Sequence, residues 1–285
     1  MSDVVETTPP APANPVARPL LEGEGVLLID HKGRRYLITL KAGAEFHSHT
    51  GFIRHDDLIG TSEGTTVRTG RGANADPAAP PSTGYSGAFI VLRPTLADFV
   101  LKMPRGAQVI YPKDLGPLLL LADIFPGARV LESGVGSGAL SMTMLRAGAD
   151  VVGYELRADF ASRAVKNVEA FLGVSHRHRF RVEERDTYEG IDETDLDRVV
   201  LDLPEPWQVT PHAVRSLRPG GIIVAYTPTI VQAVQFRESL TPGGWAEAET
   251  IEVLNRSWHI EGQSVRPDHR MVAHTGFLTH ARRLA

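Results

Sequence analysis

The stretch "VVLDLPEPW", residues 199–207, ends an apolar run with a carboxylate on a stiff turn. Its first three residues have the composition of a buried strand, and Asp202 follows at the tip. Pro204 and Pro206 can continue neither a central strand nor a helix. An acid held on such a turn is suited to orienting a substrate or stabilising a developing positive charge. The alternative is a structural role, in which Asp202 caps the next helix and Trp207 packs the turn.

A second candidate is the glycine-rich stretch "VLESGVGSGAL", residues 130–140. An apolar strand leads into Glu132, and Gly134, Gly136 and Gly138 then open a helix. Glycines at such a bend allow the backbone to approach a ligand closely and the helix to pack on the strand. The pattern is weak by itself, because an ordinary tight turn between a strand and a helix has the same composition.

Two further acids make this interpretation more specific. Glu155 ends the next strand, "DVVGYE", where a carboxylate can bind both hydroxyls of a ribose. Asp186 follows the third strand at the same edge and suits an adenine amino group. A ribose contact also fits NAD, but here Glu132 precedes the glycines and the spacing is not G-x-G-x-x-G. The glycine turn, the ribose acid and the adenine acid together indicate S-adenosylmethionine as the cofactor.

The elements that must position these residues alternate between strands and helices. Strands are predicted at 129–134, 150–155, 179–184, 197–203 and 221–228, and helices at about 139–147, 158–172, 209–217 and 229–240. This alternation is typical of an α/β fold with a doubly wound parallel sheet. The last two strands, 249–260 and 274–283, have no helix between them, which predicts an antiparallel hairpin at the sheet edge.

The rest of the chain is divided by its composition. Residues 1–20 contain five prolines and little that can pack, which predicts a disordered tail. Short alternating runs over 21–93 predict a small N-terminal β-rich domain, with a loop at 70–87. We expect a linker helix at 94–104 and a catalytic domain over 105–285.

The length, composition and net charge of the chain narrow the class of protein. The chain has 285 residues, 42% of them hydrophobic, and a formal net charge of -4, so there is no global electrostatic argument for nucleic-acid binding. The absence of cysteine excludes disulfides, thiolate metal sites and a cysteine nucleophile. No apolar run is long enough to span a membrane and the N-terminus does not resemble a secretory signal, so we expect a cytoplasmic protein.

Two other clusters have competing interpretations. His47, His49 and His55 are loosely spaced without a convincing acidic ligand, so we expect a solvated or tRNA-facing loop and no metal site. The basic runs "HRHRFR", residues 176–181, and "GRR", residues 33–35, are either solvated faces or phosphate contacts.

Four segments resemble one family, the TrmI-type tRNA (adenine-N1)-methyltransferases, which belong to the class I methyltransferases and modify adenosine 58 in the T-loop. "AEFHSHTGFIRHDDLIG" is similar to that family's N-terminal domain, and residues 92–114, "LRPTLADFVLKMPRGAQVIYPKD", to its inter-domain segment and the strand leading into the catalytic domain. "LDLPEPW" is similar to its substrate motif and "HTGFL" to its C-terminal strand. The resemblance implies a Rossmann-like fold, a tRNA substrate and a homotetramer.

The resemblance also assigns roles to individual residues. It implies that Asp202 faces the target adenine with Tyr111 beside it, although Tyr111 is alternatively a core tyrosine. Glu155 would bind the ribose and Asp186 the adenine of the cofactor. The remaining cofactor contacts would come from the glycine turn, its flanks and the segment before Tyr111: Gln108, Glu132, Gly134, Gly136, Ser137, Gly138, Ala139 and Leu140, with Asp202 also at the cofactor's edge. Pro204 departs from the Met or Leu of relatives, and the 70–87 loop is longer than usual.

Three functional hypotheses follow. The first is transfer of the methyl group of S-adenosylmethionine to N1 of the T-loop adenosine, leaving S-adenosylhomocysteine. N1 of adenine is itself the nucleophile, so no covalent residue is needed, in agreement with the absence of cysteine. The second is methylation of another RNA position, a small molecule or a protein. The third, a non-catalytic partner subunit, is disfavoured because the glycine turn, Glu155, Asp186 and Asp202 occur together.

Overall fold

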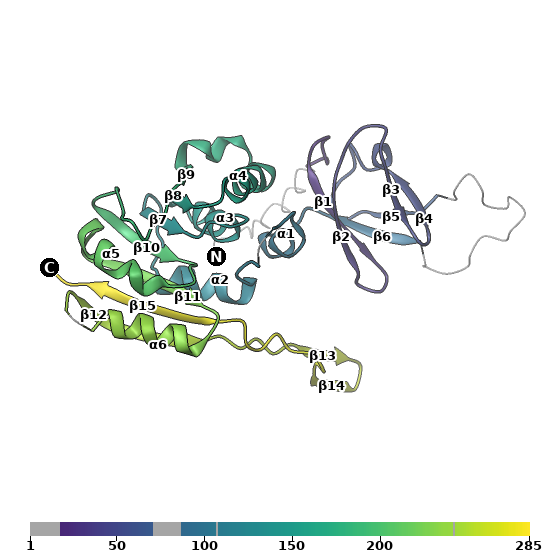
Figure 1. Ribbon diagram of the computed structural model, residues 1–285. Coiled ribbons are helices and arrows are strands. Elements are labelled where there is room, and N and C mark those ends of the chain that lie inside the picture. The colour runs from purple at the N-terminus through teal and green to yellow at the C-terminus, as the bar shows by residue number, and fades with distance from the viewer. Residues whose placement is uncertain (1–17, 71–86, 107, 242) are drawn as a thin grey trace, which may run out of the picture. The chain divides into compact units, whose positions relative to one another are not determined.

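The computed structural model describes residues 18–70, 87–106, 108–241 and 243–285. The predicted tail over 1–17 and most of the predicted loop, 71–86, lie outside the described residues. The chain divides into two compact units, Met1–Arg93 and Pro94–Ala285. Figure 1 shows both units.

The first unit is a β structure. Its main sheet is antiparallel with strand order β2-β1-β6-β5, and β3 and β4 form a separate hairpin. The strands are β1 (Gly25–Asp30), β2 (Arg35–Thr39), β3 (Glu45–Ser48), β4 (Gly51–Arg54), β5 (Thr66–Arg68) and β6 (Ala88–Leu92), with a short 3₁₀ helix η1 (His55–Asp57) after β4. Alternate side chains of these strands form one core, which includes Leu28, Phe89 and Val91.

Leu20 corrects the predicted end of the tail. Its side chain is completely buried in the core of the first unit. Its backbone N–H donates to the Thr61 carbonyl at 2.7 Å, and Pro19 forms a bridge with Ser62. The proline-rich composition concealed that Leu20 packs into the domain, so the predicted tail does not extend to residue 20.

The second unit is a seven-stranded mixed sheet between two layers of helices. Its strand order is β12-β15-β11-β10-β7-β8-β9, with β15 antiparallel to both neighbours. The strands are β7 (Arg129–Ser133), β8 (Asp150–Glu155), β9 (Phe180–Glu184), β10 (Leu196–Leu201), β11 (Leu217–Thr227), β12 (Trp245–Glu252) and β15 (Phe277–Arg283). This is an α/β fold with a doubly wound sheet, as predicted.

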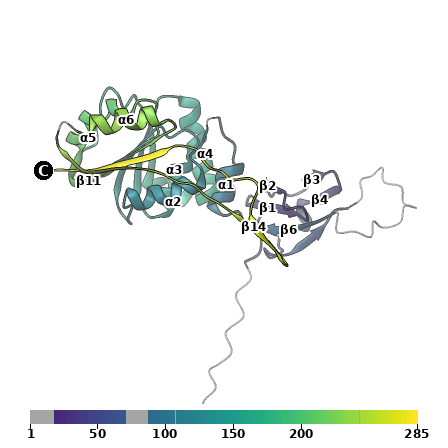
Figure 2. The same ribbon diagram turned by 90° about the horizontal axis from the view of Figure 1, so that it is seen from below.

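The helices divide between the two faces of the sheet (Figure 2). One face carries α1 (Leu96–Lys102), α2 (Pro112–Leu121), α3 (Ala139–Arg146) and α4 (Ala158–Leu172), and the other carries α5 (Thr210–Ser216) and α6 (Ile230–Ser239). Every residue of β10 is buried, as expected for a central strand covered on both sides. Because β7, β8, β9, β10 and β11 run parallel, their carboxyl ends meet at one edge, where the candidate residues lie.

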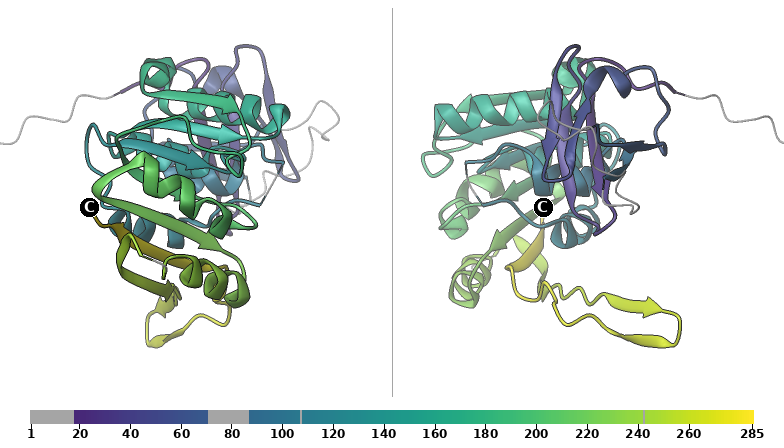
Figure 3. Two further views of the ribbon diagram at one scale, coloured as in Figure 1. Left: turned by 60° about the vertical axis from the view of Figure 1, so that its left-hand side comes forward. Right: turned by 90° about the vertical axis from the view of Figure 1, so that its right-hand side faces the viewer.

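Two predicted elements differ from the structure. The segment before Tyr111 is not a strand, and Tyr111 instead precedes α2, which the Gly116–Pro117 pair concealed as an apparent helix breaker. The single strand predicted over 249–260 is also wrong. The chain leaves β12 after Glu252 and forms a separate hairpin of β13 (Trp258–Glu261) and β14 (Ser264–Pro267), the arm, before β15 returns to pair with β12 (Figures 1 and 3).

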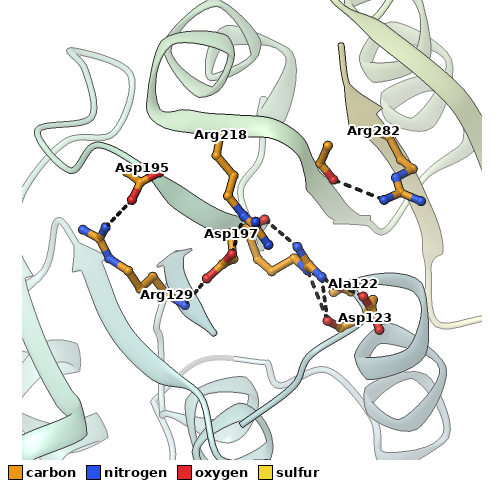
Figure 4. A network of polar contacts seen from close by, with 9 residues as sticks. Ala122, Asp123, Arg129, Asp195, Asp197, Arg218 and Arg282 are labelled. Atoms are coloured by element: carbon orange, nitrogen blue, oxygen red, sulfur yellow. Dashed lines mark hydrogen bonds and ion pairs between the residues drawn. The ribbon is translucent and has the colours of Figure 1, made fainter. Parts of the chain in front are cut away.

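A polar network lies at the amino ends of the parallel strands (Figure 4). The Arg198 side chain is 3% exposed and donates to the carbonyl oxygens of Ala122, Asp123 and Asp197. The last turn of a helix leaves carbonyls without helical partners, and Ala122 and Asp123 follow directly after α2. Arg198 therefore fixes the C-terminal end of α2, the helix whose other end begins at Tyr111.

We expect Arg198→Ala to lower the free energy of unfolding by about 3–5 kcal/mol, because it leaves buried carbonyls without donors. Urea unfolding followed by circular dichroism measures this. Arg282→Ala is the matched control, since the Arg282 side chain is 52% exposed and its change should stay within about 0.5 kcal/mol. Equal effects of the two substitutions would show that the Arg198 contacts carry no special weight.

Candidate active site

The glycine turn between β7 and α3 brings the chain unusually close to the end of β10. Gly134, Gly136 and Gly138 have φ values of 85°, 57° and 84°, in the region that side chains other than glycine rarely adopt. A Cβ on Gly134 would lie 2.1 Å from the carbonyl oxygen of Asp202. A Cβ on Gly138 would lie 3.3 Å from the backbone of Ala164 in α4. The glycines of this stretch are therefore required where the turn passes close to the backbone of β10's end and of α4.

Glu155, at the end of β8, is held by the same turn. Its two carboxylate oxygens accept hydrogen bonds from the backbone N–H of Gly136 at 2.9 Å and of Arg157 at 3.0 Å. The residue is 8% exposed. Each oxygen keeps further lone pairs, so the carboxylate is fixed in orientation and can still accept hydrogen bonds from a vicinal diol.

Two cavities meet at Gly134. The larger, of about 250 Å³, is lined by Glu155, Asp186, Tyr188 and Leu203 among others, and the smaller, of about 20 Å³, by Gln108, Glu132, Ser137 and Asp202 among others. Gly136, Ala139 and Leu140 also line the smaller cavity. The structure thus gathers nearly all residues proposed for the cofactor along one path. Gly138 and Tyr111 line neither cavity.

Glu132 is the most unusual group in the smaller cavity. It is fully buried, the Ser141 hydroxyl donates to Oε2 at 2.5 Å, and Oε1 has no partner among the described residues. Burial, with the charges of Asp202 and Glu155, raises the pKa of Glu132 to about 8, against the hydrogen bond from Ser141. The Ser137 hydroxyl is likewise buried without a partner in the described part of the chain. A cationic ligand with hydrogen-bonding groups would satisfy both.

Asp202 follows β10 at the sheet edge. Its backbone N–H donates to the Ser133 carbonyl at 2.9 Å, and its half-buried carboxylate has no hydrogen bond to any described residue. Burial first, and then the charge of Glu155, raise the pKa of Asp202 to about 7.

Neither η3 (Pro206–Gln208) nor α5 has a side-chain cap, so Asp202 does not serve as a helix cap. Trp207 packs against the core beneath, in agreement with the structural alternative for that residue.

Tyr226, which the sequence prediction did not identify, adjoins Asp202, and the predicted Tyr111 lies near Tyr226. Tyr111 precedes the first turn of α2, and Tyr226 lies at the end of β11. Leu201 pairs with Ala225, so the next residues, Asp202 and Tyr226, lie side by side at the strand ends. Burial, with the charges of Asp114, Asp202 and Tyr111, raises the pKa of Tyr226 to about 12 against a hydrogen bond to Thr275. The signal was available, because "GIIVAYTP" ends a strand at the same edge.

The remaining candidates are the histidines of the first unit and the basic cluster at residues 176–181. His55 Nδ1 accepts from the Lys41 backbone N–H, while His49 contacts Arg34 and His47 contacts Glu45. No group of three potential ligands suited to a metal occurs among the described residues. The 176–181 cluster lines a separate cavity of about 450 Å³ at the amino ends of the strands, where Arg177 and Arg181 already pair with glutamates. A phosphate contact there stays a prediction.

The fold and the turn–acid arrangement define a class I methyltransferase. A family model described as "tRNA methyltransferase complex GCD14 subunit" matches residues 87–266, and one described as "TrmI-like N-terminal" matches residues 19–67. The chain therefore belongs to this family of tRNA methyltransferases. Within the described ranges, no helix is long and apolar enough to cross a membrane.

Individual relatives agree with this assignment. The tRNA (adenine(58)-N(1))-methyltransferase TrmI of Thermus thermophilus is 36% identical, over 90% of this chain and 96% of its own length. The tRNA (adenine(57)-N(1)/adenine(58)-N(1))-methyltransferase of Methanocaldococcus jannaschii is 32% identical, over 90% and 94%.

Solved structures extend the likeness to the backbone. The tRNA (m1A58) methyltransferase TrmI of Aquifex aeolicus matches with a TM-score of 0.77 at 26% identity, covering 94% of this chain and 100% of that one. A SAM-dependent O-methyltransferase of Thermotoga maritima matches with a TM-score of 0.83 at 29% identity, covering 93% and 95%.

The raised pKa values of Asp202 and Glu132 predict a pH-dependent stability. Folding raises both values, so the folded state binds more protons than the unfolded state between about pH 4 and pH 8, and the free energy of unfolding falls as pH rises through this range. Asp202→Asn removes one of these carboxyls. We expect the variant to be more stable than the wild type at about pH 9, with the difference shrinking toward about pH 5. Urea unfolding at several pH values measures this, and a difference independent of pH would contradict it.

Proposed function

We propose that this protein is an S-adenosylmethionine-dependent tRNA (adenine(58)-N(1))-methyltransferase. The observation that carries the proposal is Asp202, whose carboxylate has no hydrogen-bond partner among the described residues, lines the smaller cavity and lies beside Tyr226 at the strand ends. The names and length coverage of the Thermus and Aquifex relatives support adenine 58 as the target. A tRNA substrate also favours a cytoplasmic location.

The cofactor would lie along the two cavities. Glu155 would accept hydrogen bonds from the ribose hydroxyls and Asp186 from the adenine amino group in the larger cavity. Glu132, Ser137 and the peptide groups of the glycine turn would bind the methionine end in the smaller one. When bound, the cofactor supplies an electrophilic methyl group on a sulfonium. Its positive charges fit a site where the carboxyls of Glu132 and Asp202 are otherwise destabilised as anions.

Asp202 would act on the target base without bonding to it covalently. Attack by N1 leaves the adenine positively charged, and a fixed carboxylate near the exocyclic amino group orients the base and stabilises that charge. Alignment of the two reactants supplies the rest, and such positioning is worth at most about 7–11 kcal/mol. The base must leave its stack in the T-loop to reach a strand-end carboxylate. In this proposal Tyr226, beside Asp202, and Tyr111 would flank the base.

The direct test is to incubate the purified full chain with unmodified tRNA and S-adenosylmethionine, followed by nucleoside mass spectrometry and mapping. 1-Methyladenosine at position 58 is the expected result. Methylation of another position would instead support the second hypothesis, a methyltransferase for a different RNA site. Cofactor binding without tRNA methylation would point to a small-molecule or protein substrate.

Asp202→Ala should lower kcat by at least about 100-fold, because it removes the group that stabilises charge on the base. The cofactor dissociation constant, measured by calorimetry, should change only a few-fold. The matched control is Glu205→Gln, an exposed carboxylate on the same turn, which should retain nearly full activity. Loss of cofactor binding in Asp202→Ala would assign Asp202 to the cofactor site instead.

We also propose that the protein assembles as a homotetramer and that the arm contributes to the contact. In the arm, Trp258 pairs with Pro267 and Ile260 with Val265, so these four side chains share one face. Trp258, Ile260 and Val265 are 57%, 74% and 59% exposed. An isolated two-stranded hairpin is marginal in water, and one with an apolar face needs a covering surface, which a second copy of the chain would provide.

The double substitution Trp258→Ser with Ile260→Ser should yield a smaller species than the wild type in light scattering, with unchanged circular dichroism. His259→Ser is the control, because His259 lies on the opposite, polar face of the arm with Arg266. A wild-type chain that is monomeric at all concentrations would refute the assembly. An unchanged tetramer in the double variant would place the contact elsewhere.

A further inference from the structure

The segment His274–Gly276, which we call the return segment, joins the arm to β15 and contacts several elements of the site. The Thr275 hydroxyl donates to Asp114 Oδ2 at 2.6 Å, and the Tyr226 hydroxyl donates to the Thr275 carbonyl at 2.5 Å. His274 has one ring nitrogen 2.6 Å from Glu252 Oε1 and the other 2.9 Å from the Pro228 carbonyl. Two consecutive residues, His274 and Thr275, thus connect α2, β11 and β12.

Gly276 leaves the space that the ring of Tyr226 occupies. A Cβ at this position would lie 2.5 Å from Cζ and 2.8 Å from the hydroxyl oxygen of Tyr226. The ring of Tyr226 can therefore lie where it does only because residue 276 has no side chain. Together with the Thr275 carbonyl, this fixes both the position of the ring and the direction of its hydroxyl.

The other side of the arm is tied to the same helix. Lys113 Nζ donates to the Val253 carbonyl at 2.6 Å and to Asp114 Oδ1 at 2.8 Å. The side chains of Lys113 and Asp114 are 5% and 0% exposed. A buried ion pair is weak evidence for stability, because desolvation offsets most of the attraction, but its geometry is specific. Here the geometry links the first turn of α2, directly after Tyr111, to the segments that lead into and out of the arm.

We propose that the return segment positions the two tyrosines around Asp202 for methyl transfer, with Thr275 and Asp114 as positioning residues that touch neither cofactor nor base. The proposal rests on the proposed function, since Tyr111 and Tyr226 are taken to flank the target adenine. It adds a role for the "HTGF" stretch, which otherwise serves only to lead into β15 at Phe277. Thr275 acts on Tyr226 through its carbonyl and on α2 through its hydroxyl.

The test compares three variants of the full chain with the wild type in tRNA methylation. Thr275→Val keeps the side-chain shape and removes the donor to Asp114, so kcat should fall about 10-fold. Thr275→Ser keeps the hydroxyl and should restore most of that loss. Gly276→Ala forces the Tyr226 ring to move, and kcat should fall by about 100-fold, as expected for a displacement near 1 Å.

Three further measurements separate positioning from a general loss of structure. The KM for tRNA and the cofactor dissociation constant should stay within about three-fold, and Thr275→Val and Tyr226→Phe should show non-additive effects on kcat. Losses of kcat that track a lower thermal midpoint in every variant would overturn the proposal, as would wild-type kcat in Thr275→Val. An inactive wild-type chain would overturn the proposed function and this inference together. Failure of this inference alone would instead be seen in a chain whose wild type is active, so the two failures are distinguishable.

Discussion

Three carboxyl groups converge at the carboxyl edge of the central sheet, and their burial beside one another is the constraint around which the site is built. Glu132, Glu155 and Asp202 come from neighbouring strands, and burial first, then the charges of Asp202 and Glu155, raise the pKa of Glu132. Only Glu155 is stabilised by two backbone N–H donors. The site therefore holds more negative charge than its own donors can compensate, which is favourable only when a cation binds there.

The scaffold keeps these groups in place from both ends of the strands. At the amino ends, Arg198 bonds to the carbonyls that follow α2, and Asp197 accepts from Arg218 and from the backbone of Arg129 (Figure 4). At the carboxyl ends, Gly134 lets the glycine turn contact the backbone of Asp202. Asn167 in α4 donates to the Ser137 carbonyl at 2.9 Å and so fixes the same turn from the helix side. Contacts that do not take part in the chemistry therefore hold the mutually repelling groups of the site in place.

The local sequence was sufficient to predict the position of a site residue where that position depends only on the strand that carries it. Asp202 could be placed because three apolar residues precede it and prolines end the strand, and Glu155 because it closes an apolar run. Tyr226 was missed, although its strand was predicted, because its ring position depends on Gly276, which is distant in the sequence. The Lys113–Asp114 pair was missed because charged residues are normally expected at the surface, and nothing local shows that Val253 and Thr275 will cover it. The arm was missed because it has no core of its own to give a pattern.

The position of the arm in the chain has a consequence for catalysis. The segments that lead into and out of the arm contain Val253 and Thr275, which bond to adjacent residues of α2, and Thr275 also accepts from Tyr226. A partner that covers the apolar face of the arm would restrict the motion of both segments. Since a positioned group is effective only when its position is held, assembly and catalysis are expected to be coupled through these few hydrogen bonds. A chain whose arm is uncovered would keep the acids of the cofactor cavities in place, because they are held by the glycine turn and by β8, while the tyrosines next to Asp202 would be held less firmly.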